Sequence, residues 1–399
     1  MIKKVVFLIS MPLYHRDYDR FGAKILIENG FNVVFFNFTP FLYPVLFEKG
    51  PKKNRYEGER QELFFSEKEA LCEISKLKSD CFVVSFLHYR HSTFGIYREL
   101  SKVRVPYAIS MISAIPTSTR DSSPIEGIVS RIRRIEISRV PTIIKNYLFR
   151  PEHARYMGIR EPTLLLAGGK KSASHSRVSL SGEGTEILWG HTYDYDLYLK
   201  NKNENFQDHD GEDKAVFLDA PTPRFAHNSL VPRIKNYLTE ERYYPSLCAF
   251  FDRLEKELKV KVEIASHPAS EHGENPNYFG NRRVLRGKTC EQIMQSKIVI
   301  NRDSTSMNFA VLAKKPVVFI TSAEAEEHPE NYLSSSIHAM ASWLGKEPLN
   351  IDTNVSWNFE KEMLVDSAAY DFFKKSYIKY KGPEEQSLWQ IVADRLKKI

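Results

Sequence analysis

The stretch KIVINRDSTSMNFAVLAKKPVVFIT, residues 297–321, decides the fold class, because it reads as a strand, a polar loop, a helix and a second strand. KIVIN and VVFIT are short, almost wholly apolar runs, which is typical of strands buried on both faces of a parallel sheet. The helix between them is expected over 305–313. A strand–helix–strand unit of this kind predicts parallel pairing with a right-handed crossover, as in a Rossmann-like domain.

The same alternation of apolar runs and amphipathic stretches continues on both sides of this unit. Further strands are expected at 5–10, 33–38, 82–86, 107–112, 163–169, 186–190, 215–219 and 260–266. Further helices are expected at 17–28, 66–78, 240–258, 289–295, 332–344, 358–374 and 384–398. The polar, turn-rich segment 201–213 favours a linker. We therefore expect an N-terminal Rossmann-like domain at 1–200, a C-terminal one at 201–375, and a final helix at 376–399 that packs back on the first domain.

Length and composition agree with two globular domains and exclude several classes of protein. The chain has 399 residues, 42% of them hydrophobic, and 57 Lys and Arg against 50 Asp and Glu give a net charge of +7. No apolar run approaches the about 20 residues that cross a bilayer. The cysteines form no CxxC pair and lie scattered, at Cys72, Cys81, Cys248 and Cys290. We therefore expect a cytoplasmic protein with reduced thiols, neither secreted nor membrane-spanning.

The excess positive charge gathers between Arg131 and Arg155, where arginines alternate with apolar residues. Such a basic amphipathic segment suits peripheral contact with an anionic membrane, at the inner face of the cytoplasmic membrane. A solvated helix face with salt bridges between the domains is the alternative. A nucleic-acid partner is not expected, because no nucleic-acid-binding motif accompanies the charge.

Ligands of open parallel sheets bind beyond the carboxyl ends of the strands, so the residues that follow each apolar run are the candidates for a site. Ser304, Thr305 and Ser306 follow one strand and open a helix. Free backbone N–H groups, hydroxyls and the helix dipole would together hold a phosphate there. An ordinary helix cap is the alternative for such hydroxyls.

Three more candidates follow strands or open helices. His267, which precedes Pro268, can donate a hydrogen bond to a phosphate or carboxylate, and a surface histidine is the alternative. Asp219 suits a general base, with a turn or helix cap as the alternative. Glu291, in the first turn of a short helix, suits a ribose diol, and compensation of the helix dipole is the alternative.

The order of these pieces, with Asp219 first, then His267-Pro268, Glu291 and the hydroxyl run, resembles the bacterial sialyltransferases and related transferases of the GT-B fold that use CMP-activated sugars. The chain looks closest to surface-carbohydrate (polysaccharide) biosynthesis proteins. The matching stretches are HTYDYDLYLK, AVFLDAPTP, IASHPAS, GKTCEQI and RDSTSMNFAVLAKKPVVFIT. They cover the C-terminal half and the linker. The resemblance implies an α/β fold of two Rossmann-like domains facing a cleft, with the acceptor on the first domain and the donor on the second.

The resemblance also implies an activity. It is that of an inverting glycosyltransferase, which moves a 2-keto acid sugar (a sialic acid-like nonulosonate or Kdo) from a CMP donor to a glycan or lipid-linked glycan in bacterial lipopolysaccharide or capsule synthesis. Asp219 would be the general base, and His267 with Pro268 would contact the phosphate. Glu291 would hold the ribose, and Ser304, Thr305 and Ser306 would bind the phosphate. No metal or other cofactor is expected, because CMP carries a single phosphate.

Several alternatives stay open. The acidic motif of those transferases usually has two acids followed by glycine, whereas this chain has Leu218-Asp219-Ala220, so Asp194 and Asp196 are rival carboxylates. The candidates for contact with the acceptor or the sugar carboxylate follow the first strand and are Tyr14, His15 and Arg16. An ordinary polar loop is the alternative for them. A UDP-sugar transferase or epimerase of the GT-B fold, or a non-catalytic protein of polysaccharide assembly, is the alternative function.

Overall fold

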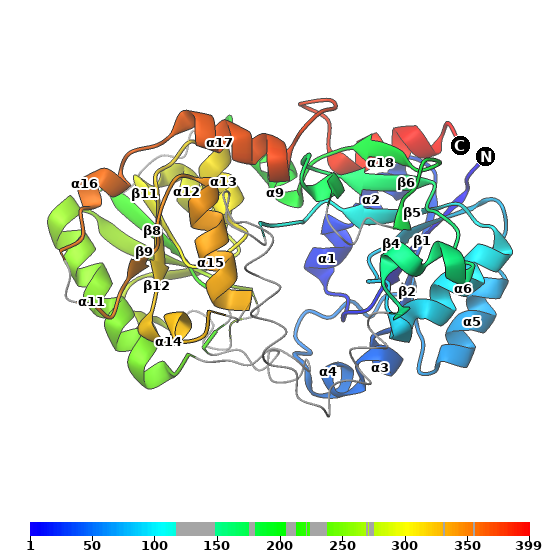
Figure 1. Ribbon diagram of the computed structural model, residues 1–399, viewed down its shortest axis with the longest axis horizontal. Helices are drawn as coiled ribbons and strands as arrows, with labels where there is room; N and C mark the ends of the chain where they lie inside the picture. Colours follow the sequence, from blue (N-terminus) through cyan, green and yellow to red (C-terminus); the bar gives the residue numbers. More distant parts are fainter. Residues whose placement is uncertain are drawn as a thin grey trace. The chain divides into compact units, whose positions relative to one another are not determined.

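The computed structural model describes most of the chain in two compact units (Figure 1). The described residues are 1–116, 148–174, 180–204, 213–220, 222–223, 238–268, 270, 275–329, 332–353 and 356–399. The first unit takes the described residues of 1–114, 148–192 and 379–399, and the second takes 115–116 and those of 193–378. Each unit is an α/β structure built on one parallel sheet.

The sheet of the first unit has seven parallel strands in the order β3-β2-β1-β4-β5-β6-β7. The strands are β1 (Lys4–Ile9), β2 (Asn32–Asn37), β3 (Gln61–Leu63), β4 (Cys81–Ser85), β5 (Tyr107–Met111), β6 (Leu164–Ala167) and β7 (Glu186–Trp189). The helices are α1 (His15–Arg20), α2 (Ala23–Glu28), α3 (Thr39–Leu42), α4 (Pro44–Lys49), α5 (Glu67–Ser75), α6 (Phe94–Val103) and α18 (Leu388–Leu396).

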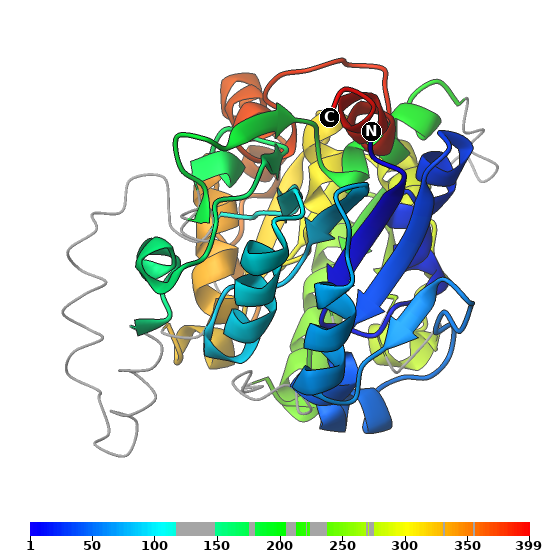
Figure 2. The same ribbon diagram turned by 90° about the vertical axis from the view of Figure 1, so that its right-hand side faces the viewer.

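Alternation of side chains along β1 supplies both faces of this sheet with apolar packing. Val6 and Leu8 join the core that α5 and α6 cover. These two helices lie side by side on that face (Figure 2). Phe7 points the other way and meets the ring of Trp389 edge-on, with 5.3 Å between ring centroids. Burial on both faces explains why β1 is apolar from Val5 to Ile9.

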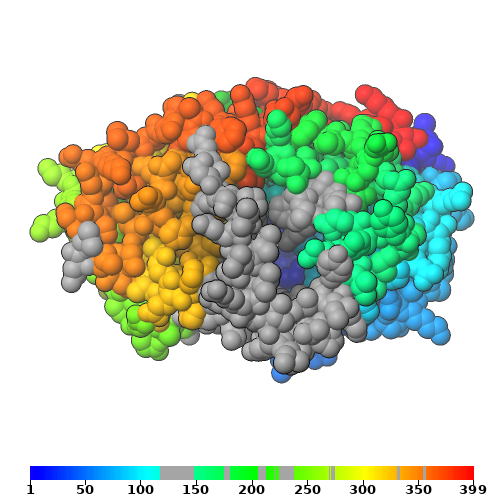
Figure 3. Space-filling model, in the orientation of Figure 1, coloured from blue at the N-terminus to red at the C-terminus, as the bar shows by residue number. Residues whose placement is uncertain are grey.

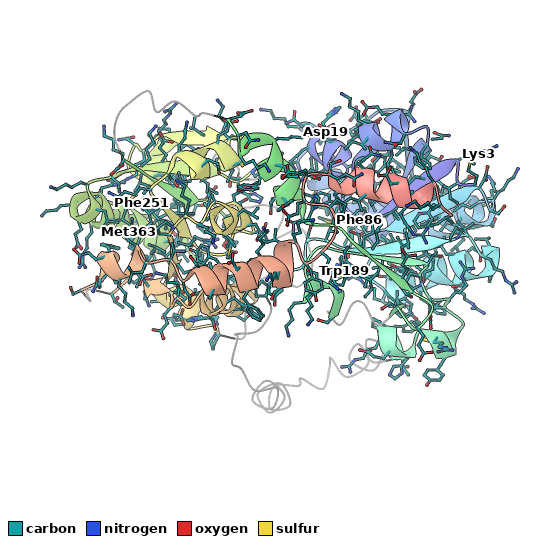
Figure 4. All side chains as sticks on the ribbon, turned by 90° about the horizontal axis from the view of Figure 1, so that it is seen from above. Lys3, Asp19, Phe86, Trp189, Phe251 and Met363 are labelled. Carbon is teal, nitrogen blue, oxygen red and sulfur yellow. The ribbon has the colours of Figure 1, made fainter. Side chains whose placement is uncertain are left out.

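The C-terminal helix α18 belongs to the first unit through Trp389. This side chain is 1% exposed, and its indole N–H donates to the carbonyl of Arg20 at 2.6 Å. Gly22 lies directly beneath it with φ +62°, and a Cβ added there would lie 2.0 Å from the indole ring. Both the backbone conformation and the close approach therefore require glycine between α1 and α2. Ahead of α18, Tyr380 packs edge-on against Trp189, which Figure 4 labels.

The sheet of the second unit has six parallel strands in the order β10-β9-β8-β11-β12-β13. They are β8 (Lys214–Leu218), β9 (Lys261–Ser266), β10 (Val284–Arg286), β11 (Ile298–Asn301), β12 (Val317–Thr321) and β13 (Leu349–Asn350). The helices are α9 (Tyr193–Asn201), α11 (Glu240–Leu258), α12 (Thr289–Gln295), α13 (Met307–Leu312), α14 (Ala323–Glu326), α15 (Tyr332–Trp343), α16 (Phe359–Glu362) and α17 (Ser367–Phe373).

Apolar cores lie on both faces of this second sheet. On one face, Phe217 of β8 packs against Phe251 of α11, with ring centroids 5.3 Å apart; Figure 4 labels Phe251. On the other face, Val216 packs in the core that α12 and α13 share. The region of α15 to α17, orange in Figure 3, lies at the surface of this unit. The two-sided cover explains the uninterrupted apolar runs of β8, β11 and β12.

The predicted fold class, α/β with two Rossmann-like halves, is confirmed, while several predicted boundaries move. The helix expected over 17–28 is divided into α1 and α2 at Gly22. The helix expected from Thr305 begins at Met307, because the hydroxyl residues before it form turns. Helix α9, which the expected boundary at residue 200 placed in the first domain, packs on α12 and α13 of the second unit.

The described part of the chain also bears on the expectations for membrane spans, cysteines and the basic segment. Within it, no helix is both long and apolar enough to cross a bilayer. Each of the four cysteines is a free thiol. Most of the basic segment from Arg131 to Arg155 lies outside the described residues. At its end, Arg155 is exposed and lies 3.7 Å from the carboxylate of Glu161.

Candidate functional site

The candidate site is the carboxyl edge of the second unit's sheet, where all six strands end on one side because they are parallel. Leu218, the last residue of β8, pairs with Ala265 of β9 and with Asn301 of β11. The residues that follow these strands therefore lie next to one another. The sheet brings Asp219 and the His267 turn together and places the loop before α13 beside them.

Asp219 follows β8 directly and is 6% exposed. Its Oδ2 accepts a hydrogen bond from the backbone N–H of His267 at 3.0 Å and one from the Ser270 hydroxyl at 2.7 Å. Its own N–H donates to the carbonyl of Ala265 at 3.1 Å. The side chain thus fastens the turn after β9 to the end of β8. The imidazole of His267 is half-buried at this edge, and Pro268 is exposed.

The three hydroxyl residues form the loop between β11 and α13. The Asn301 side chain, which is fully buried, accepts a hydrogen bond from the Ser304 N–H at 3.0 Å. The Ser304 hydroxyl in turn accepts one from the Ser306 N–H at 3.3 Å. Thr305 is exposed, and Ser306 makes no side-chain cap to α13. The loop is therefore organised by its own side chains.

Arg302 lies at the centre of this edge and was not among the residues singled out from the sequence. Its guanidinium is almost wholly buried and donates to Asp303 Oδ1 (3.0 Å), to the Thr222 carbonyl (3.0 Å) and to Thr222 Oγ1 (2.6 Å). It also lies over the ring of Tyr243, 5.2 Å from the centroid. Arg302 therefore ties the segment after β8 to the loop after β11.

The electrostatics of Arg302 follow from these neighbours. Burial alone would lower the pKa of the guanidinium, but Asp303, Tyr243 and Asp219 together raise it above its ordinary value. Burial also raises the pKa of Tyr243 to about 12, against an opposing contribution from Arg302. The guanidinium is therefore a fixed positive charge inside the edge. The sequence signal that could have found it is a charged pair, Arg302-Asp303, between two mostly apolar elements.

The remaining sequence candidates of the second unit divide into two groups. Glu291 lies half-buried in the first turn of α12, which begins just after β10 and so at the same edge. Asp194 is buried on α9, and its Oδ2 accepts from the Asn308 amide on α13 at 2.8 Å. This bond joins two helices, so Asp194 serves the packing of the unit. Asp196 lies two residues further along α9 and is half-buried.

The candidates of the first unit lie at the start of α1. The Tyr14 hydroxyl donates to the carbonyl of Pro51 at 3.1 Å, and burial raises its pKa. His15 is exposed, with its ring edge-on to Tyr56 at 5.5 Å. Arg16 is exposed and pairs with Asp17 at 3.0 Å. Tyr14 thus holds a loop, while His15 and Arg16 present their charged or polar groups to solvent.

Cationic residues also follow or end β10 at this edge. Arg286 ends β10, and its Nη2 donates to the Ser270 carbonyl at 2.8 Å. Lys288, two residues later, is exposed. Among the residues that the structure describes, no group of three or more His, Cys, Asp or Glu side chains converges as a metal site. Besides the carboxylates of Asp219, Asp303 and Glu291, the edge offers hydrogen-bond donors and positive charges, which suit an anion.

Comparison with known proteins supports the fold. No family model matches the chain, and no curated protein matches its sequence. The wall teichoic acid polymerase TagF, in a structure with CDPG, is similar over 99% of this chain and 88% of its own, at 14% identity and a TM-score of 0.51. At this identity the likeness concerns the fold alone, which is of the predicted GT-B type.

Two other solved structures are similar over the whole length of both chains, at lower TM-scores. MurG of Acinetobacter baumannii has 12% identity and a TM-score of 0.46. The UDP-GlcNAc 2-epimerase of Neisseria meningitidis, bound to UDP-GlcNAc, has 10% identity and a TM-score of 0.43. The site assignments therefore depend on the geometry of this chain.

Proposed function

We propose that the protein is a glycosyltransferase that takes its sugar from a nucleotide donor, and that the nucleotide binds at the carboxyl edge of the second unit's sheet. One observation carries the proposal. Three consecutive parallel strands, β9, β8 and β11, end together and place the His267 turn and a loop of three hydroxyl residues on the two sides of the end of β8. Phosphate groups bind at such edges in open α/β sheets.

In this proposal the donor's phosphate contacts Ser304, Thr305 and Ser306 through hydroxyl and backbone N–H donors. The imidazole of His267 contacts the same phosphate from the end of β9, which β8 separates from β11. Glu291, at the start of α12, holds the ribose hydroxyls. Arg302 does not reach the ligand, because Asp303 and Thr222 already engage its guanidinium, but its charge favours an anion nearby.

The proposed reaction is an inverting displacement. An acceptor hydroxyl attacks the anomeric carbon of the donor sugar, the bond from that carbon to the phosphate oxygen breaks, and the hydroxyl proton passes to a base. The electron pair of the broken bond stays on the phosphate oxygen. His267 and the hydroxyl loop stabilise that developing negative charge, which is the contribution that such preorganised donors make to a transition state.

Two donor classes suit such a site. The family resemblance implies a CMP-linked 2-keto acid sugar, for transfer to a glycan of the bacterial surface. The second class is a UDP-sugar, the ligand of the similar epimerase from Neisseria meningitidis. Both present a pyrimidine ribonucleotide with phosphate at the reacting end, so the residue roles proposed above apply to either.

Isothermal titration of the full chain with CMP and with UDP, in the presence and absence of excess EDTA, tests the proposal. We expect at least one nucleotide to bind, and the tighter one identifies the donor class. Replacing Ser304 and Thr305 together by alanine should weaken binding by about tenfold or more, because two phosphate donors are lost. Ser367→Ala, an exposed serine at the start of α17, is the control. Binding of neither nucleotide would contradict the proposal.

A further inference from the structure

We infer that Asp219 is a positioning residue that holds the His267 turn through hydrogen bonds, and is not the base that removes the acceptor's proton. The inference rests on the nucleotide-binding site proposed above, and it names what fixes the geometry of that site. It departs from the role that the family resemblance implied for this residue.

Three hydrogen bonds of Asp219 fasten β8 to the end of β9. Its Oδ2 accepts from the His267 N–H and from the Ser270 hydroxyl, at 3.0 and 2.7 Å. Its backbone N–H donates to Ala265 at 3.1 Å, which extends the strand pairing by one residue. The carboxylate therefore fixes both ends of the turn that carries the imidazole of His267.

A hydrogen bond from β10, the strand on the other side of β9, also holds this turn. The Arg286 guanidinium, at the end of β10, donates to the Ser270 carbonyl at 2.8 Å. Ser270 is itself buried, at 6% exposure. It is thus held from β8 through its hydroxyl and from β10 through its carbonyl. Hydrogen bonds from the ends of β8 and β10 therefore hold the turn after β9, and with it His267.

The same contacts make Asp219 a poor base. Its Oδ2 is already engaged by two donors, the His267 N–H and the Ser270 hydroxyl. A general base must also lie within about 2.6–3.2 Å of the proton that it removes, or reach it through one water. Only 6% of Asp219 is exposed for such contact.

Substitution by asparagine separates the two roles. The amide oxygen of asparagine accepts the same two hydrogen bonds but takes no proton near neutral pH. If Asp219 positions the turn, Asp219→Asn should keep nucleotide affinity and turnover within about threefold of wild type, while Asp219→Ala should lose about tenfold or more in affinity. Ser270→Ala, which removes one of the two donors, should lie between them.

The experiment is isothermal titration of the four proteins with CMP and UDP, together with nucleotide release from CMP- and UDP-sugars. Asp366→Ala is the control, because Asp366 also accepts a backbone N–H, from Ala369 at 3.0 Å, but caps α17. Loss of turnover in Asp219→Asn to the level of Asp219→Ala would overturn the inference and restore the base. So would wild-type affinity in Asp219→Ala.

Hydrogen exchange at the His267 amide supplies a readout that needs no ligand. We expect slow exchange in wild type and in Asp219→Asn, and fast exchange in Asp219→Ala, with the rest of the second unit unchanged. Equal protection in all three proteins would refute the positioning role. If the wild-type protein binds neither nucleotide while this exchange pattern holds, the proposed function fails and the positioning role stands.

Discussion

Replacement of Arg302 by methionine tests the buried contacts at the carboxyl edge of the second sheet. Methionine fills much of the same volume but leaves Asp303, the Thr222 carbonyl and the Thr222 hydroxyl without the guanidinium that they now bind. Breaking a buried ion pair by removing one partner costs about 3–5 kcal/mol. Asp303 is 21% exposed and can regain some water, so we expect about 3 kcal/mol.

Such a loss is a large part of the stability of an ordinary domain, which is about 5–15 kcal/mol. Urea unfolding of the full chain, followed by hydrogen exchange with peptide resolution, measures it and assigns it to a unit. We expect peptides of the second unit to exchange at lower urea, while those of the first unit do not change. Arg302→Lys should recover part of the loss, because lysine keeps the charge but cannot make the three hydrogen bonds of the guanidinium.

Arg395 provides the matched control, since it pairs with Glu186 at the surface of the first unit. An exposed pair of this kind contributes about 0–1 kcal/mol, so Arg395→Met should hardly change the unfolding transition. If Arg302→Met is as mild as Arg395→Met, then Arg302 is not the tie between the two loops, and the account of this edge is wrong.

Three further predictions concern other parts of the chain. Gly22→Ala should lower the free energy of unfolding of the first unit by about 2–4 kcal/mol, because it adds both a positive-φ strain and a clash with Trp389. Gly30→Ala, at φ +90° with open space around its Cβ, should show only the smaller backbone cost in the same urea titration. The pKa of the Tyr243 hydroxyl is about 12 in the folded protein against an ordinary 10.0, so the unfolded chain loses this proton at lower pH than the folded one. The free energy of unfolding should therefore fall as the pH rises from 10.0 to about 12. Urea titrations at several alkaline pH values should show a shallower fall in Tyr243→Phe, and an equal slope would count against burial as the cause. Glu291→Gln should weaken nucleotide binding by about tenfold in isothermal titration, whereas Glu360→Gln on α16 should not; unchanged affinity would remove Glu291 from the site.

The strands that could be predicted from the sequence are those covered on both faces. β1, β8, β11 and β12 are apolar at nearly every position because helices pack on each side. The strands that were missed, β3, β10 and β13, are two or three residues long and lie at or near sheet ends, where side chains are partly exposed. Their residues carry no pattern that a short window could detect.

The break between α1 and α2 could not be predicted for a different reason. The spacing of Phe21, Ile25 and Leu26 is helical, and Gly22 alone does not forbid a continuous helix. What fixes the break is the indole of Trp389, more than 360 residues away in sequence, which requires the space above Gly22. Contacts of this range leave no local signal.

The candidate site was predictable in position but not in its internal contacts. Asp219, His267 and Ser304 all lie at the carboxyl edge of one sheet, as expected of residues that follow parallel strands. Ser270 was missed because a lone serine carries no motif, and Arg302 was missed although it forms a charged pair with Asp303 after an apolar strand. Asp194 stayed a rival carboxylate until its bond to Asn308, on a helix more than 100 residues later, assigned it to packing.

A crystal structure of the full chain soaked with UDP or CMP tests the central claim most directly. The account predicts a phosphate in contact with His267 and with the loop of Ser304, Thr305 and Ser306, and a ribose near Glu291. A nucleotide bound elsewhere, for example against Tyr14 and Arg16 in the first unit, would contradict it. So would crystals that take up neither nucleotide when the carboxyl edge of the second sheet is open to solvent.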